Sequence, residues 1–223
     1  MSGINEFIDK WSSQFLTASI ETFQMVGISL LFSTLIGIPL GILLVLSKTG
    51  QALENKWLNQ ILNLIVNVIR SVPFIILLFF ILPFTKALVG TTIGVQGVIV
   101  PLVLYTAPYI SRLMETALLE VENGVVEAYT AMGIKKRSII WHVMLREARP
   151  SIILGLTIAT VSLIGATAMA GLVGAGGLGD LAYRYGHLRY EVDVMYVTIF
   201  ILIILVQSIQ SFGNRLAARL KKD

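Results

Sequence analysis

Long runs of apolar residues, separated by shorter polar segments, dominate the chain. The runs cover Ala18–Leu46, Leu58–Leu82, Gly94–Leu113, Ile152–Val173 and Val194–Phe212. Each is close to or longer than the roughly 20 residues that an α-helix needs to cross the hydrocarbon of a bilayer. The pattern therefore predicts an all-α membrane protein with five transmembrane helices.

Composition agrees with a lipid environment. Of the 223 residues, 56% are hydrophobic and 13% are charged, whereas a soluble domain has about 25% charged residues. The chain has no cysteine, which excludes disulfides and cysteine-ligated metal sites. No histidine, aspartate and glutamate cluster with metal-ligand spacing occurs either, so we expect no metal site, no catalytic residue and no enzymatic activity.

The distribution of basic residues predicts the orientation, since Lys and Arg are enriched in cytoplasmic segments. With five spans the termini lie on opposite sides of the membrane. One side would have only Lys10, Lys86, Arg184 and Arg189. The other would have eleven basic residues: Lys48, Lys56, Lys135, Lys136, Arg137, Arg146, Arg149, Arg215, Arg219, Lys221 and Lys222. We therefore expect the N-terminus outside and the C-terminus in the cytoplasm, with no nucleic-acid partner behind the net charge of +4.

The polar insert, defined here as residues 115–150, is the longest polar stretch on the predicted cytoplasmic side. One apolar stripe with steps of three and four residues predicts an amphipathic helix; it consists of Leu118, Val121, Val125, Ala128 and Met132. Gly133 follows where a left-handed helix cap is expected. Ile139, Ile140 and Val143 begin a second stripe that ends before Pro150. The insert is thus predicted to be a helix, a turn and a helix.

Two partners fit such an insert. Its basic residues would attract anionic lipid at the membrane surface. Five glutamates roughly cancel that charge and favour a protein partner; they are Glu115, Glu120, Glu122, Glu127 and Glu147.

A glycine-rich stretch after the fourth run has the spacing of a dinucleotide-binding turn. Gly174, Gly176 and Gly179 match G-x-G-x-x-G, but that motif requires a β-strand before it and a helix after it. Here an apolar helix precedes the glycines. We interpret them as a tight external turn that lets helices approach closely; the alternative is that they line the outer mouth of a pathway, beside Asp180, Arg184 and Tyr185.

Single polar residues in apolar runs also need an explanation. Arg70 lies about 12 residues into the second run, one turn before Pro73. A charge at that depth is a functional-site hypothesis, and the alternative is that Arg70 supports carbonyls freed by Pro73. Arg112 lies near a helix end, where it can reach the interface or meet Glu115 at helical spacing. His142 is expected to pack or face solvent rather than to bind metal.

The insert resembles the cytoplasmic EAA loop of ABC-importer permeases. That loop reads Glu-Ala-Ala, three residues, Gly, nine residues, Ile-x-Leu-Pro. Glu127, Ala128 and Gly133 match its first part, and Val143 and Leu145 match its second part conservatively. Two positions depart from it. Tyr129 replaces the second alanine, which bears on the docking face, and Arg146 replaces the proline, which lets the following helix continue.

The resemblance extends over nearly the whole chain from about residue 20. "RSVPFIILLFFILPFTKALVGTTIG", "IVPLVLYTAPYISRLMETALLEV" and "AMAGLVGAGGLGDLAYRYG" are similar to segments of the permease subunits of bacterial methionine importers. It implies a single transmembrane permease domain, residues 1–223, in the bacterial inner membrane, which imports methionine. Import of another small amino acid or solute is the alternative within this family.

The resemblance also implies partners. These are a second copy of the chain, two cytoplasmic ATPase subunits, an extracytoplasmic methionine-binding protein and membrane lipid. No G-x-x-x-x-G-K-[ST] phosphate loop occurs in the chain, so ATP and Mg would be bound by the ATPase and no cofactor by this chain. Glu127, Ala128 and Gly133 would form the ATPase-coupling segment, and the binding protein would meet loops near Thr91 and 174–190.

A dimer would place one helix from each copy beside the pathway. The fourth run is our candidate, since Ser162, Ala166, Ala170 and Gly174 form a face of small residues, with Thr167 nearby and Met169 as a steric gate. Such a face also suits plain helix packing. An unrelated secondary carrier is the other class considered; it would ordinarily show more spans, repeats and carboxylates within spans, and we find none of these in the sequence.

Overall fold

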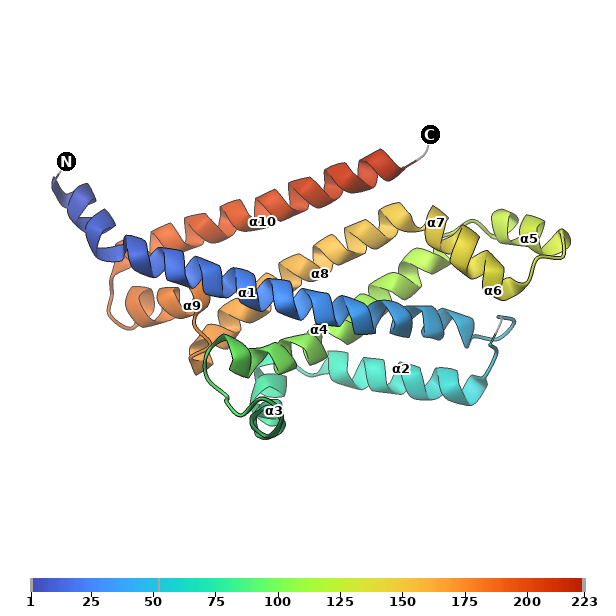
Figure 1. Ribbon diagram of the computed structural model, residues 1–223, viewed down its shortest axis with the longest axis horizontal. Helices are drawn as coiled ribbons and strands as arrows, with labels where there is room; N and C mark the ends of the chain where they lie inside the picture. Colours follow the sequence, from blue (N-terminus) through green and yellow to red (C-terminus); the bar gives the residue numbers. More distant parts are fainter. Residues whose placement is uncertain (1, 52, 222–223) are drawn as a thin grey trace. The chain divides into compact units, whose positions relative to one another are not determined.

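A computed structural model describes residues 2–51 and 53–221, and over these residues the chain is helical with no β-strand. Figure 1 shows the helices along the chain, coloured by residue number. The α-helices are α1 (Ser2–Leu46), α2 (Lys56–Ser71), α3 (Phe74–Val89), α4 (Gly94–Leu119), α5 (Asn123–Ala131), α6 (Lys136–Ile139), α7 (Leu145–Glu147), α8 (Arg149–Ala170), α9 (Gly177–Leu181) and α10 (Val192–Leu220). Two π-helical segments, η1 (Ile140–Met144) and η3 (Ala182–His187), and a 3₁₀ turn, η2 (Gly171–Val173), complete them.

Contacts divide the chain into two compact units, each assembled from separate parts of the sequence. Unit 1 comprises Met1–Leu31, Pro73–Leu104 and Thr160–Ile209. Unit 2 comprises Phe32–Val72, Tyr105–Ala159 and Gln210–Asp223. Each of α1, α4, α8 and α10 therefore contributes one part to each unit.

Among the described residues, four helices are long and apolar enough to cross a membrane: α1, α4, α8 and α10, the span on α8 continuing to Val173. They contain four of the five predicted spans. The α1 helix begins at Ser2, well before the predicted Ala18, and so includes the polar residues ahead of the apolar run. Counting α2 and α3 together as one broken span gives the fifth.

The span predicted over Leu58–Leu82 is not one continuous helix. The α2 helix ends at Ser71, and Val72 is extended, with φ −88° and ψ 125°. A residue before proline is pushed out of the helical region by the proline ring. Pro73 then caps the start of α3, a position where its missing N–H costs no helical hydrogen bond. Its carbonyl accepts from the N–H groups of Ile76 and Leu77, both at 3.0 Å. Pro73 thus divides the span.

Pro39, by contrast, lies inside α1 without ending it. Beside it, glycines bring α1 close to α4 in unit 2. A Cβ on Gly37 would lie 2.7 Å from the Ala107 carbonyl oxygen, and one on Gly41 would lie 2.6 Å from Met114 Cβ. Only glycine permits this separation, because a larger side chain would overlap backbone or branch-point atoms of α4.

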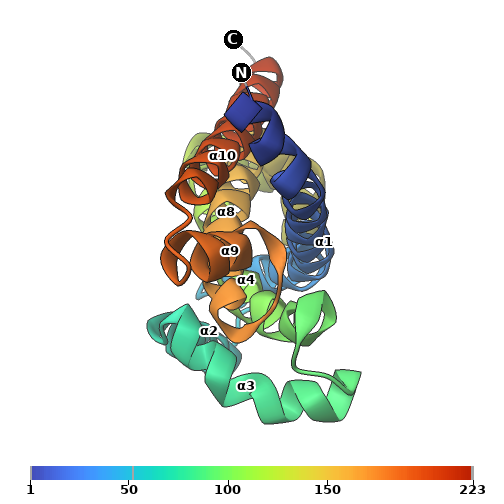
Figure 2. The same cartoon turned by 90° about the vertical axis from the view of Figure 1, so that its left-hand side faces the viewer.

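Each unit has its own apolar cluster. In unit 2 the end of α1 packs with the end of α4 and with α6, η1 and α7; buried members are Ile42, Val45, Leu46, Met114, Leu118, Ile139, Ile140 and Met144. In unit 1 the first part of α1 packs with α9 and the start of α10, through Trp11, Ala18, Leu178, Leu181 and Val194. Figure 2 shows α9 beside the first part of α1.

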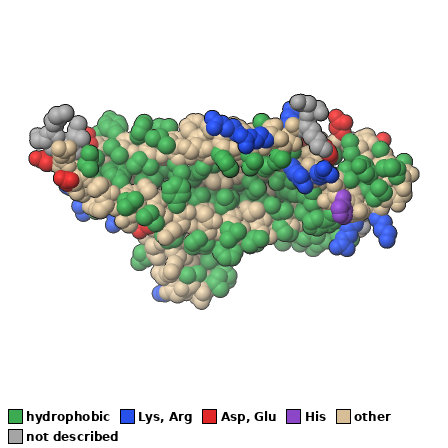
Figure 3. All heavy atoms as spheres, turned by 45° about the horizontal axis from the view of Figure 1, so that its top comes forward, with side chains coloured by type: hydrophobic (Ala, Val, Ile, Leu, Met, Phe, Trp, Pro, Cys, Tyr) green, Lys and Arg blue, Asp and Glu red, His purple; other side chains and the backbone are tan. Residues whose placement is uncertain are grey.

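Large apolar side chains also lie on the surface. Phe80 on α3, Trp57 on α2 and Phe200 on α10 are each more than half exposed. In Figure 3 hydrophobic side chains cover much of the visible face, whereas Lys and Arg gather in a few places. Exposed apolar area on this scale is expected where lipid rather than water is the solvent.

Candidate functional site

The predicted turn in the polar insert closes the end of α5. Gly133 has φ +75°, and its N–H donates to the Thr130 carbonyl at 2.9 Å. The N–H of Ile134 donates to the Tyr129 carbonyl at 3.2 Å. This pair of bonds is a Schellman motif, which requires a left-handed residue after the helix. The prediction that Gly133 caps the helix is confirmed.

The turn depends on the backbone of Gly133 rather than on space around it, since a Cβ there would meet nothing within 4 Å. Glu127 and Ala128 are exposed, and Met132 is 63% exposed. The Tyr129 side chain is half-buried and packs against the apolar cluster of unit 2. The departure at Tyr129 therefore strengthens the inner face of α5 and leaves the outer face to Glu127 and Ala128.

After the turn the chain forms a second helical stretch, as predicted. It runs through α6, η1 and α7, and α5 and α6 lie side by side (Figure 1). Ile139 and Ile140 are buried against unit 2. Arg146, at the position of the missing proline, is exposed in α7. The chain remains helical to α8 after a single turn residue, Ala148, so the expected continuation is confirmed.

The single apolar stripe predicted from Leu118 to Met132 is not one helix. The α4 helix ends at Leu119, and α5 starts at Asn123. Glu122 between them has φ −55° and ψ 130°, outside the helical region. Asn123 and Gly124, the first residues of α5, are weak helix formers, which favours an interruption at this point. The apolar residues keep their steps of three and four across the break.

A polar cluster in unit 2 holds the end of α4, and the sequence predicted only its Arg112–Glu115 pair. Glu115 is 5% exposed and lies between two cations: Lys48 Nζ is 2.8 Å from its Oε1 and Arg112 Nη1 is 2.5 Å from its Oε2. The predicted Arg112–Glu115 pair is thus confirmed. Lys48 comes from the segment after α1, so the buried carboxylate of Glu115, the first residue of the insert, joins that segment to the end of α4.

Asparagines on one face of α2 complete the polar cluster. Arg112 Nη2 donates to Asn63 Oδ1 at 2.6 Å and to Asn67 Oδ1 at 2.9 Å. Asn59 Nδ2 donates to the Leu44 carbonyl at 3.0 Å and to Ser47 Oγ at 2.9 Å. Residues 59, 63 and 67 follow one another at steps of four, which places them on one side of a helix. That spacing was the available sequence signal, and it was missed.

Arg70 lies in the last turn of α2 rather than within an unbroken span. Its guanidinium carbon is 5.8 Å from the centroid of the Tyr109 ring, in a cation–π arrangement. A cation in the last turn of a helix is also favoured by the helix dipole. The break at Pro73 therefore places the charge at a helix end, and the functional hypothesis for Arg70 stays a prediction.

The four candidate pathway residues on α8 do not share one environment. Ala166 and Thr167 are buried, and Ser162 is half-buried. Met169 is 50% exposed. The Thr167 hydroxyl donates to the Ile164 carbonyl at 2.7 Å. Within unit 1, therefore, Ala166 and Thr167 pack against the chain, whereas Met169 faces outward.

The glycine-rich stretch allows backbones to touch in unit 1. A Cβ on Gly179 would overlap the backbone of Ala168, and one on Gly171 would overlap the backbone of Asp180. Gly174 is left-handed, and its carbonyl accepts from the Gly94 N–H at 3.0 Å. A helix and a 3₁₀ turn precede these glycines, so the dinucleotide spacing lacks its strand. The interpretation as a close-packed turn is confirmed.

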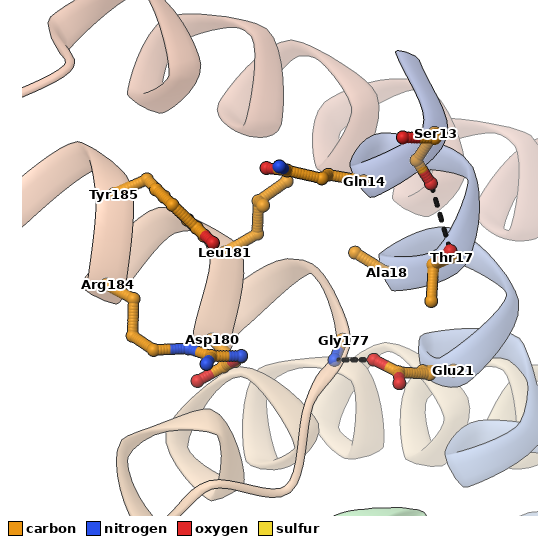
Figure 4. Close-up of a pocket in the computed structure, with 10 residues that line it drawn as sticks. All are labelled: Ser13, Gln14, Thr17, Ala18, Glu21, Gly177, Asp180, Leu181, Arg184 and Tyr185. Atoms are coloured by element: carbon orange, nitrogen blue, oxygen red, sulfur yellow. Dashed lines mark hydrogen bonds and ion pairs between the residues drawn. The ribbon is translucent and has the colours of Figure 1, made fainter. Parts of the chain in front are cut away.

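Side chains from α1 hold the start of α9. Glu21 Oε2 accepts from the Gly177 N–H at 2.7 Å (Figure 4). Thr22 Oγ1 accepts from the Leu178 N–H at 2.9 Å. Further along, Arg184 donates to the buried carboxylate of Asp180. That hydrogen bond raises the pKa of Arg184 above its ordinary value, although partial burial opposes the shift.

No group of three or more His, Cys, Asp or Glu side chains suited to a metal occurs among the described residues. His142 is exposed, and its Nδ1 is 3.1 Å from the Ser138 carbonyl one turn earlier. Of the two positions expected for this histidine, packed or facing solvent, the structure has the second.

These features define a multi-pass helical membrane protein with a structured insert next to a charged helix end. The chain belongs to the family of binding-protein-dependent transport system inner membrane components, which residues 37–222 match. It is therefore a multi-pass inner-membrane protein and a permease subunit of an ABC importer.

Several relatives are closely similar. The probable D-methionine transport system permease protein MetI of Vibrio cholerae is 48% identical over 208 residues, 93% of this chain and 92% of that protein. The methionine import system permease protein MetP of Bacillus subtilis is 43% identical over 172 residues, 77% and 78% of the two chains. A solved inward-facing structure of the MetNI methionine ABC transporter has a chain of 41% identity, with a TM-score of 0.92 over 96% of this chain and 99% of that one.

Proposed function

We propose that this chain is the permease subunit of an ATP-driven importer of methionine. The observation that carries the proposal is the polar insert. It has a Schellman turn at Gly133 and exposes Glu127 and Ala128, on a helical framework that matches a methionine transporter chain at a TM-score of 0.92. The names of the relatives from Vibrio cholerae and Bacillus subtilis support the same substrate.

In this proposal residues 1–223 act as one transmembrane domain with the N-terminus outside and the C-terminus in the cytoplasm. The charge distribution supports it. All eleven basic residues assigned to the cytoplasmic side by sequence lie in unit 2, and the four assigned to the outside lie in unit 1. Positive charge is retained on the cytoplasmic side of a membrane, which supports a cytoplasmic position for the insert.

The assembly contains two copies of this chain, two cytoplasmic ATPase subunits and an external methionine-binding protein in a lipid bilayer. ATP and Mg bind to the ATPase, and this chain binds no cofactor. Its role is to change shape when the ATPase dimer closes. A rigid helical connection from the ATPase to the spans is sufficient for that.

The structure of the insert suits this task. Glu127 and Ala128 lie on the outer face of α5, where the short alanine side chain permits close approach of a groove and the carboxylate can pair with a base. Gly133 fixes the direction in which the chain leaves α5. The polar cluster around Glu115 then connects the insert to the neighbouring helices, so that force on α5 is passed to α4 rather than lost in a flexible link.

The substrate pathway is proposed to follow α8 at the two-fold axis of the dimer. Met169, which is half exposed, would gate it. Ser162, Ala166 and Thr167 would set the packing distance behind the gate. Arg70 is kept as an intramembrane charge whose partner is the Tyr109 ring. Methionine is a zwitterion with an apolar tail, so a weakly polar passage fits it.

Uptake of labelled methionine tests the proposal. Proteoliposomes would hold this chain with its cognate ATPase and binding protein, and wild type would be compared with Gly133→Asp and Gly133→Asn. Asparagine and aspartate both tolerate φ > 0 better than most residues, but only aspartate adds a charge at the docking face. We expect ATP-dependent uptake by wild type, at least about tenfold less with Gly133→Asp, and an intermediate rate with Gly133→Asn, since about 1.4 kcal/mol is tenfold.

A matched control is Gly50→Asp. Gly50 also has a positive φ, of 82°, and open space around its Cβ, but it lies outside the polar insert. Its uptake is expected to stay near wild type. If wild type takes up other amino acids but not methionine, the substrate is wrong; if Gly50→Asp and Gly133→Asp lose uptake equally, the assignment of coupling to the turn is wrong.

A further inference from the structure

The charges of the polar insert are divided between its two halves. Residues 115–134, the acidic half, contain four glutamates and no Lys or Arg, whereas residues 135–150, the basic half, contain five Lys and Arg and one glutamate. The turn at Gly133 separates the halves. Among the side chains that the structure describes, no ion pair joins a glutamate of one half to a base of the other. The charges therefore do not cancel locally, and each half can have a partner of its own.

The basic half presents its charges on one face. Four of its apolar side chains are buried in the cluster of unit 2, namely Ile139, Ile140, Met144 and Ala148. The opposite face has Arg137, Trp141 and Arg146, all of which are exposed. Arg137 and Trp141 are four residues apart, which places them on one side of a helix. The π-helical segment η1 has wider turns, with hydrogen bonds between residues five apart, and so brings Arg146 to the same side as Trp141.

This face adjoins a helix that can cross a membrane. The span on α8 begins at Arg149, three residues after Arg146, and α6 and α7 lie between α5 and α8 (Figure 1). Further along α8 the exposed residues are apolar: Leu154 is 39% exposed and Ile158 is 51% exposed. The exposed surface of unit 2 thus changes from basic to apolar within roughly 12 Å of helix, as expected where headgroups give way to hydrocarbon.

We infer that this basic face, formed by Arg137, Trp141, Arg146 and Arg149, binds the headgroups of anionic phospholipids. Lys and Arg clustered directly on the cytoplasmic side of a span attract anionic lipid, and arginine pairs with phosphate through two parallel hydrogen bonds. Trp141 is 50% exposed. Tryptophan is enriched at the level of the headgroups, where its ring meets apolar chains and its N–H meets polar groups.

The acidic half suits a protein partner instead. Glu120, Glu122 and Glu127 are exposed and would be repelled by anionic headgroups, and on this half the proposed function docks the ATPase. The competing occupant of the basic face is an acidic surface of that ATPase, which would leave the exposed apolar residues of α8 without a partner. Lipid matches both the charge and the apolar residues. The inference rests on the proposed function for the cytoplasmic position of the insert.

Site-specific photo-cross-linking identifies what covers each half. Benzoylphenylalanine would replace either Trp141 on the basic half or Ala128 on the acidic half of the permease–ATPase complex. Both positions are exposed, so neither replacement disturbs the apolar cluster. The nanodiscs would contain equal parts of phosphatidylcholine and phosphatidylglycerol, each labelled in turn. We expect position 141 to attach to lipid, with phosphatidylglycerol in excess, and position 128 to attach to the ATPase.

A double variant, Arg137→Gln with Arg146→Gln, tests the contribution of charge at position 141. Neither arginine makes an ion pair among the described residues, so we expect the fold to be kept. The preference for phosphatidylglycerol should fall about fivefold for each charge removed. The matched control is Arg215→Gln with Arg219→Gln, two exposed positions on α10 in the same unit, which should leave the preference unchanged.

Attachment of position 141 to the ATPase, or to neither partner, would overturn the inference. Equal labelling by the two lipids, or an equal loss in the α10 control, would overturn it too. The two proposals fail separately. If position 141 attaches to phosphatidylglycerol while position 128 does not reach the ATPase, the coupling assignment is wrong and the lipid site stays. If both positions attach to the ATPase, docking is supported and the lipid site is wrong.

Discussion

Unit 1 and unit 2 are built from parts of the same long helices, yet they differ in charge. Unit 1 has four Lys and Arg against six Asp and Glu, whereas unit 2 has thirteen against seven. Each membrane-crossing helix contributes to both units, so the difference does not arise from one basic helix. It shows that the sequence assigns charge by position along the helices, as a protein held in one orientation in a membrane requires.

The units also treat buried carboxylates differently. In unit 2, Glu115 has two cationic partners, Lys48 and Arg112, whose side chains are 35% and 21% exposed. In unit 1, Asp180 has one partner, Arg184, whose side chain is 60% exposed. Unit 2 thus places charges inside its structure, and unit 1 leaves its arginine available to solvent or ligand.

Labelling of single cysteines would give the largest effect, since the outcome is all or none. The chain has no natural cysteine, so each variant carries one thiol. Leu188→Cys in unit 1 and Ala131→Cys in unit 2 are both at exposed positions. We expect an impermeant maleimide to label Leu188→Cys in intact spheroplasts and Ala131→Cys only after the membrane is opened.

Inverted membrane vesicles provide the control, because they should reverse the two results. Labelling of Ala131→Cys in intact spheroplasts would contradict the orientation, and with it the cytoplasmic position of the insert. Labelling of both residues from one side would contradict the link between charge and unit.

Removal of the buried carboxylates should produce the next largest effect. Glu115→Ala leaves two partly buried cations without their anion, and we expect a loss of roughly 3 kcal/mol, the lower end for broken buried pairs. For a chain of this size that is a fall in Tm of about 6–12 °C. Asp180→Ala should cost less, because Arg184 is already largely hydrated.

Thermal unfolding of the purified chain in detergent measures both variants, with Glu6→Ala as an exposed control. Equal shifts for Glu115→Ala and Asp180→Ala would remove the contrast between the units. A Glu115→Ala variant that unfolds at the wild-type temperature would show that the polar cluster contributes nothing to stability.

Glycine substitutions should give the smallest effect. Gly179→Ala forces a methyl group into the backbone of Ala168, and overpacking of this kind costs about 1–3 kcal/mol. Gly165→Ala is the matched control on α8, since its Cβ would meet nothing within 4 Å. Alanine there should be neutral or slightly stabilising, because it is a better helix former than glycine.

The same unfolding measurement applies, and a Gly179→Ala variant as stable as Gly165→Ala would contradict the close contact of α9 with α8. The equivalent test in unit 2 is Gly41→Ala, where Met114 Cβ is the neighbour. Similar losses at both glycines would show that close helix approach is common to the units, although their charges differ.

Local rules predicted much of this fold. Apolar run length located the spans, and helix-cap chemistry located the turn at Gly133, because each depends on residues close in sequence. Pro73 is also a local signal for the break in the second span. Proline alone does not decide the matter, because membrane helices tolerate it elsewhere, as at Pro39 in α1.

Contacts over long sequence separations were harder to predict. The caps that Glu21 and Thr22 place on α9 join residues 156 positions apart, and no local pattern marks them. Arg112 was paired with Glu115 by spacing alone, but its bonds to Asn63 and Asn67 depend on how α2 packs against α4. The pathway residues on α8 rest on the spacing of their small side chains and the coupling segment rests on resemblance, and the roles of both stay predictions.

The turn at Gly133 makes the shape of the insert independent of the side chains on its outer face. Its bonds run between backbone atoms, and the inner side chains of α5 and α6 hold it against unit 2. The outward positions, among them Glu127, Ala128 and Met132, contribute to neither. Mutations at these positions can therefore accumulate without loss of the fold. Under the proposed function, in which the ATPase docks on this face, the permease can follow sequence changes in its ATPase while the direction of the insert stays fixed.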